Sequence, residues 1–458
     1  MFDDSTTQCL LFPEIFTKPA VLQFDQQNGS SDGGAVLLKA ADRRYRLIEA
    51  LAGCLRDKRQ AGKVDHCSRE LLAQRVFSIA CGYPDANDSA RLAADPIHKM
   101  LLDRDPVAGR DLASQPTLSR FENAVGPKQL YRLGETLAAS VIQRHAERLR
   151  GRAHRVTIDL DPTDDPTHGA QQLSFFNGHY DSWCYLPVMG FVSFNDEAEQ
   201  YLCAAVLRPG NVTAAVGAVG ILRRLILLIR NFLPGVTLRV RLDGGFAHPA
   251  VLALLDAEPN LEYLVAMAKN AVLRRKAKPA MRQARTLSRR TGQTEHVYGE
   301  ANYAARTWPW QRRMIIKAEV VRAEGKKQKD NPRFVITNMK QSPQFLYEKV
   351  YCQRGEIENR IKELHDLQID RTSCSNFWAN QFRVLLTAAA YVLMQELRLR
   401  ATGTSCARAQ VWMLRERLLK LGARVLVSVR RVVVHLPASL PFLPTFRRVA
   451  LALGASPG

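Results

Sequence analysis

Five side chains able to bind phosphate or a metal ion recur at steps of three and four residues between positions 351 and 365. They are a phenol, a guanidinium, a carboxylate, an ammonium and an imidazole, from Tyr351, Arg354, Glu358, Lys362 and His365. This spacing predicts a helix that stacks all five along one face. Cations one turn to either side would keep Glu358 ionised and could bind phosphate oxygens. The pattern favours metal-dependent phosphoryl transfer on nucleic acid, and the simpler alternative is a solvated charged helix.

Two aspartates upstream favour the phosphoryl-transfer interpretation. Alternation of apolar and polar residues predicts a strand over 154–161, which Pro162 ends directly after Asp161. A second alternating strand, predicted over 236–243, ends at Asp243, and two glycines follow that let a ligand approach closely. Two strand-end aspartates and a helix-borne glutamate are suited to Mg²⁺, and two such ions can bind the attacking and leaving oxygens.

Three motifs carry a family resemblance. They are Asp159-Leu-Asp161-Pro-Thr163, Arg241-Leu-Asp243-Gly-Gly-Phe246, and the segment from Tyr351 through Glu358 that continues to Lys362. Together they resemble the DDE transposases of bacterial insertion sequences, in the branch with a Tyr-x-x-Arg-x-x-x-Glu-x-x-x-x-x-x-Lys signature. The resemblance implies that Asp161, Asp243 and Glu358 are the catalytic triad and the ligands of Mg²⁺, for which Mn²⁺ could substitute. It also implies that Tyr351 and Arg354 contact the DNA backbone.

The sequence departs from the signature at one position, and a second position is ambiguous. The signature lysine, seven residues after the glutamate, is replaced by His365. Either Lys362, one turn after Glu358, or His365 itself would then supply the phosphate-binding cation. Asp159 shares a strand face with Asp161 and could bind the metal in its place. We prefer Asp161, because it lies at the strand end and its Asp-x-Thr context matches the family's first motif.

The elements expected after residue 150 indicate an α/β fold. Strands are predicted over 154–161, 183–194, 199–207, 236–243 and 261–268, and helices over 211–232 and 247–256. Three strands follow one another antiparallel, and a helix then returns the chain so that the fourth strand pairs beside the first. This order resembles an RNase H-like mixed sheet with flanking helices. In that sheet Asp161 and Asp243 would lie close together.

The predicted organisation has four parts. Residues 1–35 form an N-terminal arm and linker, 36–150 a helical DNA-binding domain, 151–400 the RNase H-like DDE catalytic domain, and 401–458 a basic C-terminal region. A purely structural cap is the alternative for the helical domain. The catalytic domain is expected to contain a basic β insertion at about 269–340, before the glutamate.

Positive charge is concentrated in two blocks. The 458 residues include 65 Lys/Arg and 44 Asp/Glu, which gives a net charge of +21. Residues 269–340 contain 19 basic and 5 acidic residues, and residues 401–458 contain 9 and 1. This distribution predicts a polyanionic partner, with nucleic acid ahead of a membrane surface. Trp308, among arginines of the first block, could stack on unpaired DNA bases, although such a tryptophan is more often part of a core.

The cysteines and the hydropathy indicate a cytoplasmic protein, and the family resemblance implies a bacterial one. The nine cysteines include no Cys-x-x-Cys pair, which argues against zinc, and no signal peptide or membrane span is evident. Together with these observations, the resemblance implies a nucleoid-associated transposase that cleaves and joins DNA as a homodimer on double-stranded terminal inverted repeats and target DNA. The alternatives are an RNase H-like nuclease without strand transfer and a DNA-binding protein with a vestigial catalytic site.

Overall fold

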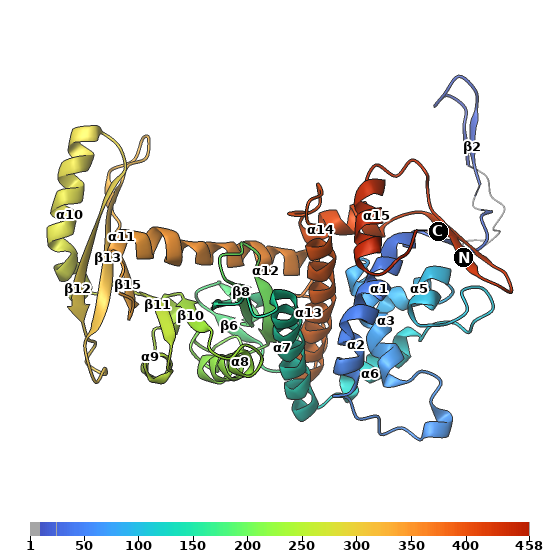
Figure 1. The fold of residues 1–458 in the computed structure, drawn as a ribbon, viewed down its shortest axis with the longest axis horizontal. Helices are drawn as coiled ribbons and strands as arrows, with labels where there is room; N and C mark the ends of the chain where they lie inside the picture. Colours follow the sequence, from blue (N-terminus) through green and yellow to red (C-terminus); the bar gives the residue numbers. More distant parts are fainter. Residues whose placement is uncertain (1–9, 24, 458) are drawn as a thin grey trace. The chain divides into compact units, whose positions relative to one another are not determined.

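The computed structural model describes residues 10–23 and 25–457 (Figure 1). The chain divides into two units, which we call the helical unit and the sheet unit. The helical unit consists of Met1–Ala124 together with Ala389–Gly458, and the sheet unit is Val125–Ala388. Among the described residues, no helix combines the length and the apolar composition needed to cross a membrane.

The division differs from the predicted boundaries after residues 35, 150 and 400. It falls after Ala124 and within helix α13 (Phe377–Arg400), so that α7 (Pro127–Leu149) belongs to the sheet unit. The first nine residues of the predicted arm lie outside the described residues. The predicted linker does not behave as a linker, because Gly33 and Gly34 are buried. A Cβ atom on Gly34 would lie 1.7 Å from the carbonyl oxygen of Leu418, so only glycine fits this turn.

The helical unit is built from short helices, of which α3 is buried on all sides from Leu71 to Ala80. The helices are α1 (Val36–Tyr45), α2 (Leu47–Ala52), α3 (Ser68–Ala80), α4 (Ser89–Leu92), α5 (Pro96–Leu101), α6 (Gln115–Ala124), α14 (Val411–Leu414) and α15 (Leu443–Ala452). Local sequence explains why helix α5 begins at Pro96. Proline is favoured at the first helical position, and the Asp95 side chain caps the helix by accepting a hydrogen bond from the His98 backbone N–H at 2.9 Å.

The strands of the helical unit are short. They are β1 (Leu10–Phe12), β2 (Ala20–Leu22), β3 (Gly29–Ser30), β16 (Ala423–Val427) and β17 (Val432–His435). Strands β1 and β2 form a hairpin, and a second sheet has the order β17-β16-β3. Strands β16 and β17 pair antiparallel with each other. The chain reverses between Ser428 and Arg431, where the Ser428 N–H donates to the Arg431 carbonyl oxygen at 3.0 Å.

The central strands of the sheet unit pair in the predicted order. Among the described residues its main sheet has nine strands, in the order β12-β13-β15-β11-β10-β4-β8-β9, with β14 on β13. The bounds are β4 (Arg155–Pro162), β8 (Val188–Phe194), β9 (Tyr201–Val206), β10 (Thr237–Leu242), β11 (Leu261–Met267), β12 (Glu295–Tyr303), β13 (Arg312–Val321), β14 (Lys329–Asp330) and β15 (Arg333–Thr337). Strand β4 pairs parallel to β10 and antiparallel to β8, so the first and fourth predicted strands are neighbours.

Helices and a small second sheet complete the surroundings of β4. Helix α8 (Ala218–Phe232) buries an apolar side that includes Ile221, Leu225 and Ile229, and α7 packs on α8 and β9. Helix α9 (Pro249–Ala257) connects β10 to β11. The small sheet has the order β5-β7-β6, formed by β5 (Asp165–Pro166), β6 (Phe175–Asn177) and β7 (Ser182–Tyr185). The strand predicted over 183–194 is thus two strands, β7 and β8, on either side of Pro187.

The segment predicted as a small β subdomain has a different structure. Strands β12, β13 and β15 extend the main sheet, because β15 pairs antiparallel with β11. Before them lies a helix that the sequence analysis missed, α10 (Ala271–Thr291), which covers β12 and β13 (Figure 1). Its apolar residues recur at steps of three and four, which could have revealed it, although Pro279 inside the helix argued against one.

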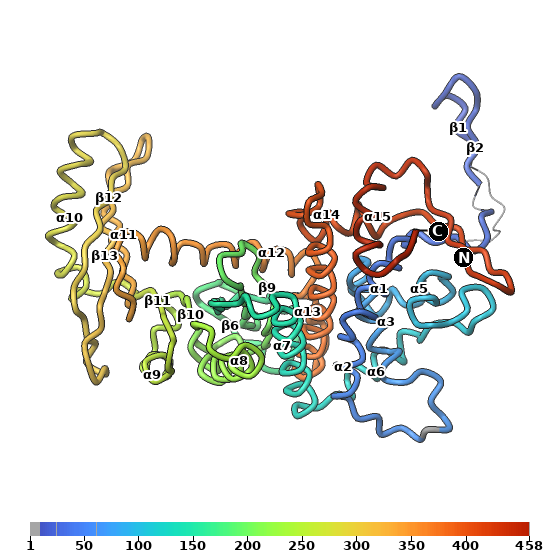
Figure 2. The backbone as a smooth tube through the Cα atoms, viewed as in Figure 1, coloured from blue at the N-terminus to red at the C-terminus, as the bar shows by residue number. Residues whose placement is uncertain are grey.

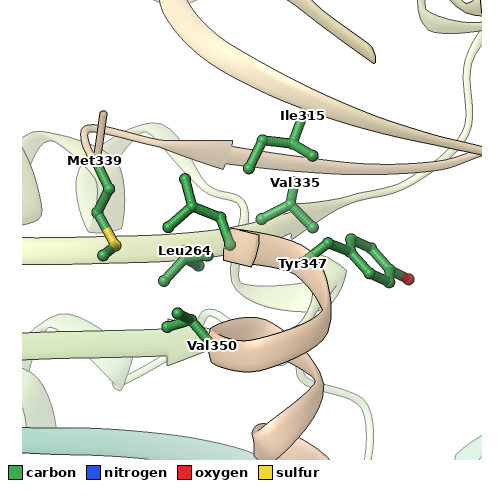
Figure 3. Packing of buried hydrophobic residues seen from close by; sticks show 7 residues of the cluster. Leu264, Ile315, Val335, Met339, Tyr347 and Val350 are labelled. Atoms are coloured by element: carbon green, nitrogen blue, oxygen red, sulfur yellow. The ribbon is translucent and has the colours of Figure 1, made fainter. Parts of the chain in front are cut away.

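The signature segment is helical but not one regular helix. It continues from α11 (Pro343–Phe345) through a π-helical stretch (Leu346–Tyr351) and a 3-10 turn (Cys352–Gly355) into α12 (Glu356–Asp366) (Figure 2). The π-helical stretch is anchored on the sheet by Leu346, Tyr347 and Val350, which pack in a buried cluster with Leu264 and Val335 (Figure 3). π-helical turns are rare and often mark functional sites.

Candidate active site

The register of two parallel strands brings the two predicted aspartates to one edge of the sheet. In the β4–β10 ladder, Arg241 pairs with Asp159 and Leu242 pairs with Leu160. The next residues along the strands are Asp161 and Asp243. Since neighbouring strands lie about 4.8 Å apart, the two carboxylates leave the sheet side by side. Asp243 also starts a 3-10 turn, and its side chain accepts a hydrogen bond from the Gly245 N–H at 2.9 Å.

Arg354 of the signature segment reaches the first aspartate. Its Nη1 atom lies 3.1 Å from Oδ1 of Asp161, and the two side chains are 16% and 14% exposed. Burial raises the pKa of Asp161 to about 6. The guanidinium of Arg354 offsets part of this rise, while the negative charges of Asp243 and Glu358 add to it. Asp161 therefore experiences the charges of Arg354, Asp243 and Glu358.

Asp159 is fully buried in an ion pair with Arg241. Its Oδ1 accepts from Nε of Arg241 at 2.8 Å, and its Oδ2 accepts from Nη2 of Arg241 at 2.6 Å and from Nε2 of Gln200 at 2.8 Å. Both carboxylate oxygens are thus bound by donors from the protein. This geometry leaves Asp159 no free oxygen for a metal, and it favours Asp161 as the first ligand.

Arg241 also holds the signature segment, a role that the sequence analysis missed. Its Nη1 donates to the Val350 carbonyl oxygen at 2.9 Å and lies 3.4 Å from Oε1 of Gln353. One buried side chain therefore joins β4, β10 and the π-helical stretch that precedes Arg354. A sequence signal was present, because Asp159 and Arg241 each stand two residues before a strand-end aspartate and so share its strand face.

The single stripe predicted for the signature is interrupted. Tyr351 ends the π-helical stretch, Arg354 lies in the 3-10 turn, and Glu358, Lys362 and His365 follow in α12. Steps of three and four do not align side chains across such a change of helical pitch. Even so, Tyr351 is close enough to Arg354 and Asp243 to feel their charges. Burial raises the pKa of its phenol, Arg354 offsets part of this rise, and Asp243 adds to it. This phenol therefore also belongs to the site.

The two candidate cations of α12 have different surroundings. Lys362 is exposed. His365 is partly buried, and its Nδ1 lies 3.2 Å from Oδ2 of Asp370. The hydrogen bond with Asp370 raises the pKa of His365 and lowers that of Asp370. A carboxylate partner neutralises the imidazolium, so the histidine is less suited than Lys362 to bind a phosphate.

Trp308 does not match its predicted role in DNA binding. It is only 9% exposed, its ring packs edge-on against Tyr303 with centroids 5.3 Å apart, and the Arg312 guanidinium lies 4.8 Å from its centroid. A ring covered in this way cannot stack on a base. The core alternative is therefore correct, and Trp310, at 51% exposure, is the accessible indole of this loop.

A cavity of about 300 Å³ lies next to the signature segment. Its lining includes Lys269, Arg333, Tyr347 and Tyr351, which combine two cations with two phenols. Tyr351 thus connects this cavity to the carboxylates, and the cations give it a preference for anionic groups. The sequence analysis placed Lys269 and Arg333 in a basic block but could not bring them together.

A group of potential metal ligands occurs in the helical unit. Atoms of Asp32, Cys81 and His98 lie within 4.8 Å of one another, and all three residues are buried. However, Nζ of Lys420 lies 2.8 Å from Oδ1 of Asp32, and Nε2 of His98 lies 3.0 Å from Oδ2. Burial also raises the pKa of the Cys81 thiol, which keeps it protonated. The ammonium already balances the carboxylate, so this group is an internal ion-pair network.

The donor set at the sheet edge fits a divalent metal ion. Asp161 and Asp243 at this edge, with Glu358 of α12, would offer carboxylate oxygens, the ligands that divalent ions such as Mg²⁺ prefer. Among the described residues, the three do not form a group whose ligand atoms all lie within 4.8 Å of one another. A wider arrangement leaves room for water and substrate phosphates, which Mg²⁺ retains as ligands. The raised pKa of Asp161, caused first by burial and then by the neighbouring carboxylates, agrees with this, because a bound cation would stabilise its ionised form.

Comparison with known proteins identifies the class. The chain belongs to the family described as transposase DDE domain group 1, whose model matches residues 12–457. It is therefore a DDE transposase, an enzyme of the polynucleotidyl transferase type that binds DNA and uses divalent metal ions. No curated protein matches the chain. Among solved structures, the piggyBac transposase in a synaptic complex with hairpin DNA is similar, with 9% identity, a TM-score of 0.41, and coverage of 84% of this chain and 78% of that chain.

Proposed function

We propose that Asp161, Asp243 and Glu358 are the catalytic triad with which this transposase cleaves its element and joins it to target DNA. The observation that carries the proposal is the β4–β10 register, which sets Asp161 beside Asp243, together with the contact of Arg354 with Asp161. We further propose that the sheet is RNase H-like. The order β9-β8-β4-β10-β11, with β4, β10 and β11 parallel, supports this assignment.

Mg²⁺ is the metal we propose, held by the three carboxylates. When bound, it would supply Lewis-acid activation of water or of a 3′-hydroxyl and charge stabilisation at the scissile phosphate. The residues of the chain have separate tasks. Asp161 and Asp243 offer oxygens from rigid strand ends, and Arg241 fixes their strands to the signature segment. Arg354 neutralises Asp161 in the metal-free protein and provides a guanidinium able to bind a phosphate.

The proposed substrates are the terminal inverted repeats of a bacterial insertion sequence and a target duplex, bound by a homodimer in the cytoplasm. A reaction with Mg²⁺ tests the function directly. The wild-type protein, a linear DNA carrying the two element ends and a supercoiled target plasmid are expected to yield both cut ends and joined products. Cut ends without any joined product would instead support a nuclease that lacks strand transfer.

The pKa of Asp161 predicts how cleavage depends on pH. The carboxyl must be ionised to bind metal, and its pKa of about 6 lies above the ordinary value of 3.8. As pH falls below about 6, the ionised fraction drops roughly tenfold per unit, so the Mg²⁺ concentration for half-maximal cleavage should rise by up to that factor. Titrating Mg²⁺ between pH 5 and 7.5 measures it. In Arg354→Gln the profile should move to higher pH, since the guanidinium lowers this pKa; a profile flat down to pH 5 contradicts the assignment.

The two candidate cations of α12 are distinguished by substitution. Lys362→Ala is expected to reduce strand transfer and to lower the salt dependence of DNA binding by about one phosphate contact. His365→Ala should act on stability instead. His365 has a higher pKa in the folded protein than in the unfolded chain, so it stabilises the fold at pH values below its unfolded-state pKa. This contribution disappears as pH rises through its folded-state pKa. Thermal unfolding and strand transfer of both variants, measured from pH 6 to 8, separate the roles. A larger loss of strand transfer at pH 6 for His365→Ala would reverse the assignment.

A further inference from the structure

All charged residues of helix α10 are cationic. The range Ala271–Thr291 contains eight Lys/Arg and no Asp/Glu. Its buried side consists of five small or apolar residues: Leu273, Ala277, Met281, Ala284 and Ser288. The helix packs on β12 and β13 (Figure 1), and one of its cations, Arg285, pairs with Asp330 of the sheet. All the cations are exposed except Arg285, which is partly buried.

Five of these cations form a line along the helix. They recur at steps of three and four residues, which places them on one face of the helix, to one side of the buried residues: Arg275, Lys278, Arg282, Arg285 and Arg289. At about 1.5 Å of rise per residue the line is roughly 21 Å long. Duplex DNA advances about 3.4 Å per base pair, so the line matches about six base pairs.

Few acidic residues of the protein neutralise the cations of this line. Within the part of the chain that the structure describes, an ion pair is found for Arg285, with Asp330, and for no other member of the line. Like charges at these spacings repel one another and destabilise an isolated helix, and Pro279 removes a hydrogen bond in its middle. Packing on the sheet maintains the helix, and an anionic partner would remove the repulsion.

The cations continue from α10 to the candidate active site. Lys269, two residues before the helix, and Arg333 line the cavity that Tyr351 also lines. Nζ of Lys269 donates to the Asn331 side-chain oxygen at 2.9 Å, an amide that carries no charge. Basic groups therefore extend from the signature segment to the far end of α10.

We propose that the cationic line of α10 binds the sugar–phosphate backbone of the duplex DNA that extends beyond the cleaved bond. The inference rests on the proposed function, because it takes DNA to be held at Asp161 and Asp243. Regularly spaced cations recognise phosphates and not base sequence, so this binding is sequence-independent. An anionic membrane is the other polyanion. Helices that bind membranes insert an apolar face, and the apolar face of α10 is covered by β12 and β13.

Paired substitutions in one helix test the proposal. Arg275→Gln with Arg282→Gln removes two charges from the line, and Lys276→Gln with Arg290→Gln removes two charges from the other exposed side of α10. Affinity of the full chain for a duplex of unrelated sequence is measured without divalent metal from 50 to 300 mM salt. The slope of log affinity against log salt should fall by about two for the line variant, at about 0.9 per phosphate. It should change by less than one for the control variant.

Three outcomes would overturn the proposal. These are an unchanged slope in the line variant, an equal change in both variants, and a line variant that loses binding to phosphatidylserine vesicles but keeps duplex binding. Arg275→Lys with Arg282→Lys retains both charges and should keep the wild-type slope, which excludes misfolding as the cause. Since no metal is present, the slopes do not depend on the triad. Failure of the triad would show separately, as cleavage that persists in Asp243→Asn.

Discussion

Replacing Asp243 by asparagine is expected to abolish DNA cleavage and strand transfer while binding of the terminal repeats remains close to that of the wild type. The carboxylate is a proposed metal ligand, and metal binding contributes several kcal/mol to transition-state stabilisation. At about 1.4 kcal/mol per factor of ten, the loss should be about 10³-fold or more. Cleavage of labelled terminal-repeat DNA with Mg²⁺ measures the first effect, and a binding titration without metal measures the second.

Asparagine is the informative substitution at this position. Its side-chain oxygen can still accept the hydrogen bond from the Gly245 N–H, so the turn after β10 should remain intact. Asp196→Asn is a matched control, because that carboxylate is 85% exposed and pairs with Arg155 at the opposite end of β4. It should leave cleavage unchanged. If Asp243→Asn weakens DNA binding as severely as it weakens cleavage, Asp243 has a structural role and not a catalytic one.

The buried pair of Asp159 and Arg241 predicts a large effect on stability. Asp159→Ala leaves the Arg241 guanidinium, itself 4% exposed, without its carboxylate. Removing one member of a buried pair costs about 3–5 kcal/mol, which corresponds to a decrease of roughly 10 °C in Tm for a unit of this size. Thermal unfolding followed by circular dichroism measures the change. Asp161→Asn, two residues further along the same strand face, should retain a Tm near the wild-type value and lose cleavage.

The double variant Asp159→Leu with Arg241→Met separates loss of the charge from loss of packing. Apolar replacements of a buried ion pair are often neutral or stabilising, so most of the lost stability should return. Strand transfer should remain impaired, because Arg241 would no longer hold the Val350 carbonyl oxygen before Arg354. An Asp159→Ala protein that unfolds like the wild type but has lost Mg²⁺-dependent cleavage would instead make Asp159 the metal ligand.

Local patterns in the sequence were sufficient for the strands that position the aspartates. Alternation of apolar and polar residues with period two, ended by Pro162 or by Gly244, identified β4 and β10 because both features depend on near neighbours. The order of the elements then predicted that these strands pair, which the structure confirms. The triad, by contrast, remains a prediction of the motifs, supported by this pairing.

Contacts between distant residues were decided only by the tertiary structure. Asp159 and Arg241 are separated by 82 residues, and their ion pair forms because folding places β4 beside β10. The arginines around Trp308 in the sequence favoured a tryptophan that stacks on DNA bases, yet Tyr303 and Arg312 cover its ring. The π-helical stretch is set by packing of Tyr347 and Val350 on the sheet.

The sequence by itself therefore determined which residues can do the chemistry and which strands carry them, since residue type and short-range periodicity are local properties. Tertiary structure alone decided which of two chemically identical residues has a carboxylate available for a metal ion. It placed Asp159 in a buried ion pair and Asp161 at the edge of the sheet, although the two stand on the same face of one strand. Burial and the long-range partner separate their roles, because each depends on atoms that folding brings from elsewhere in the chain.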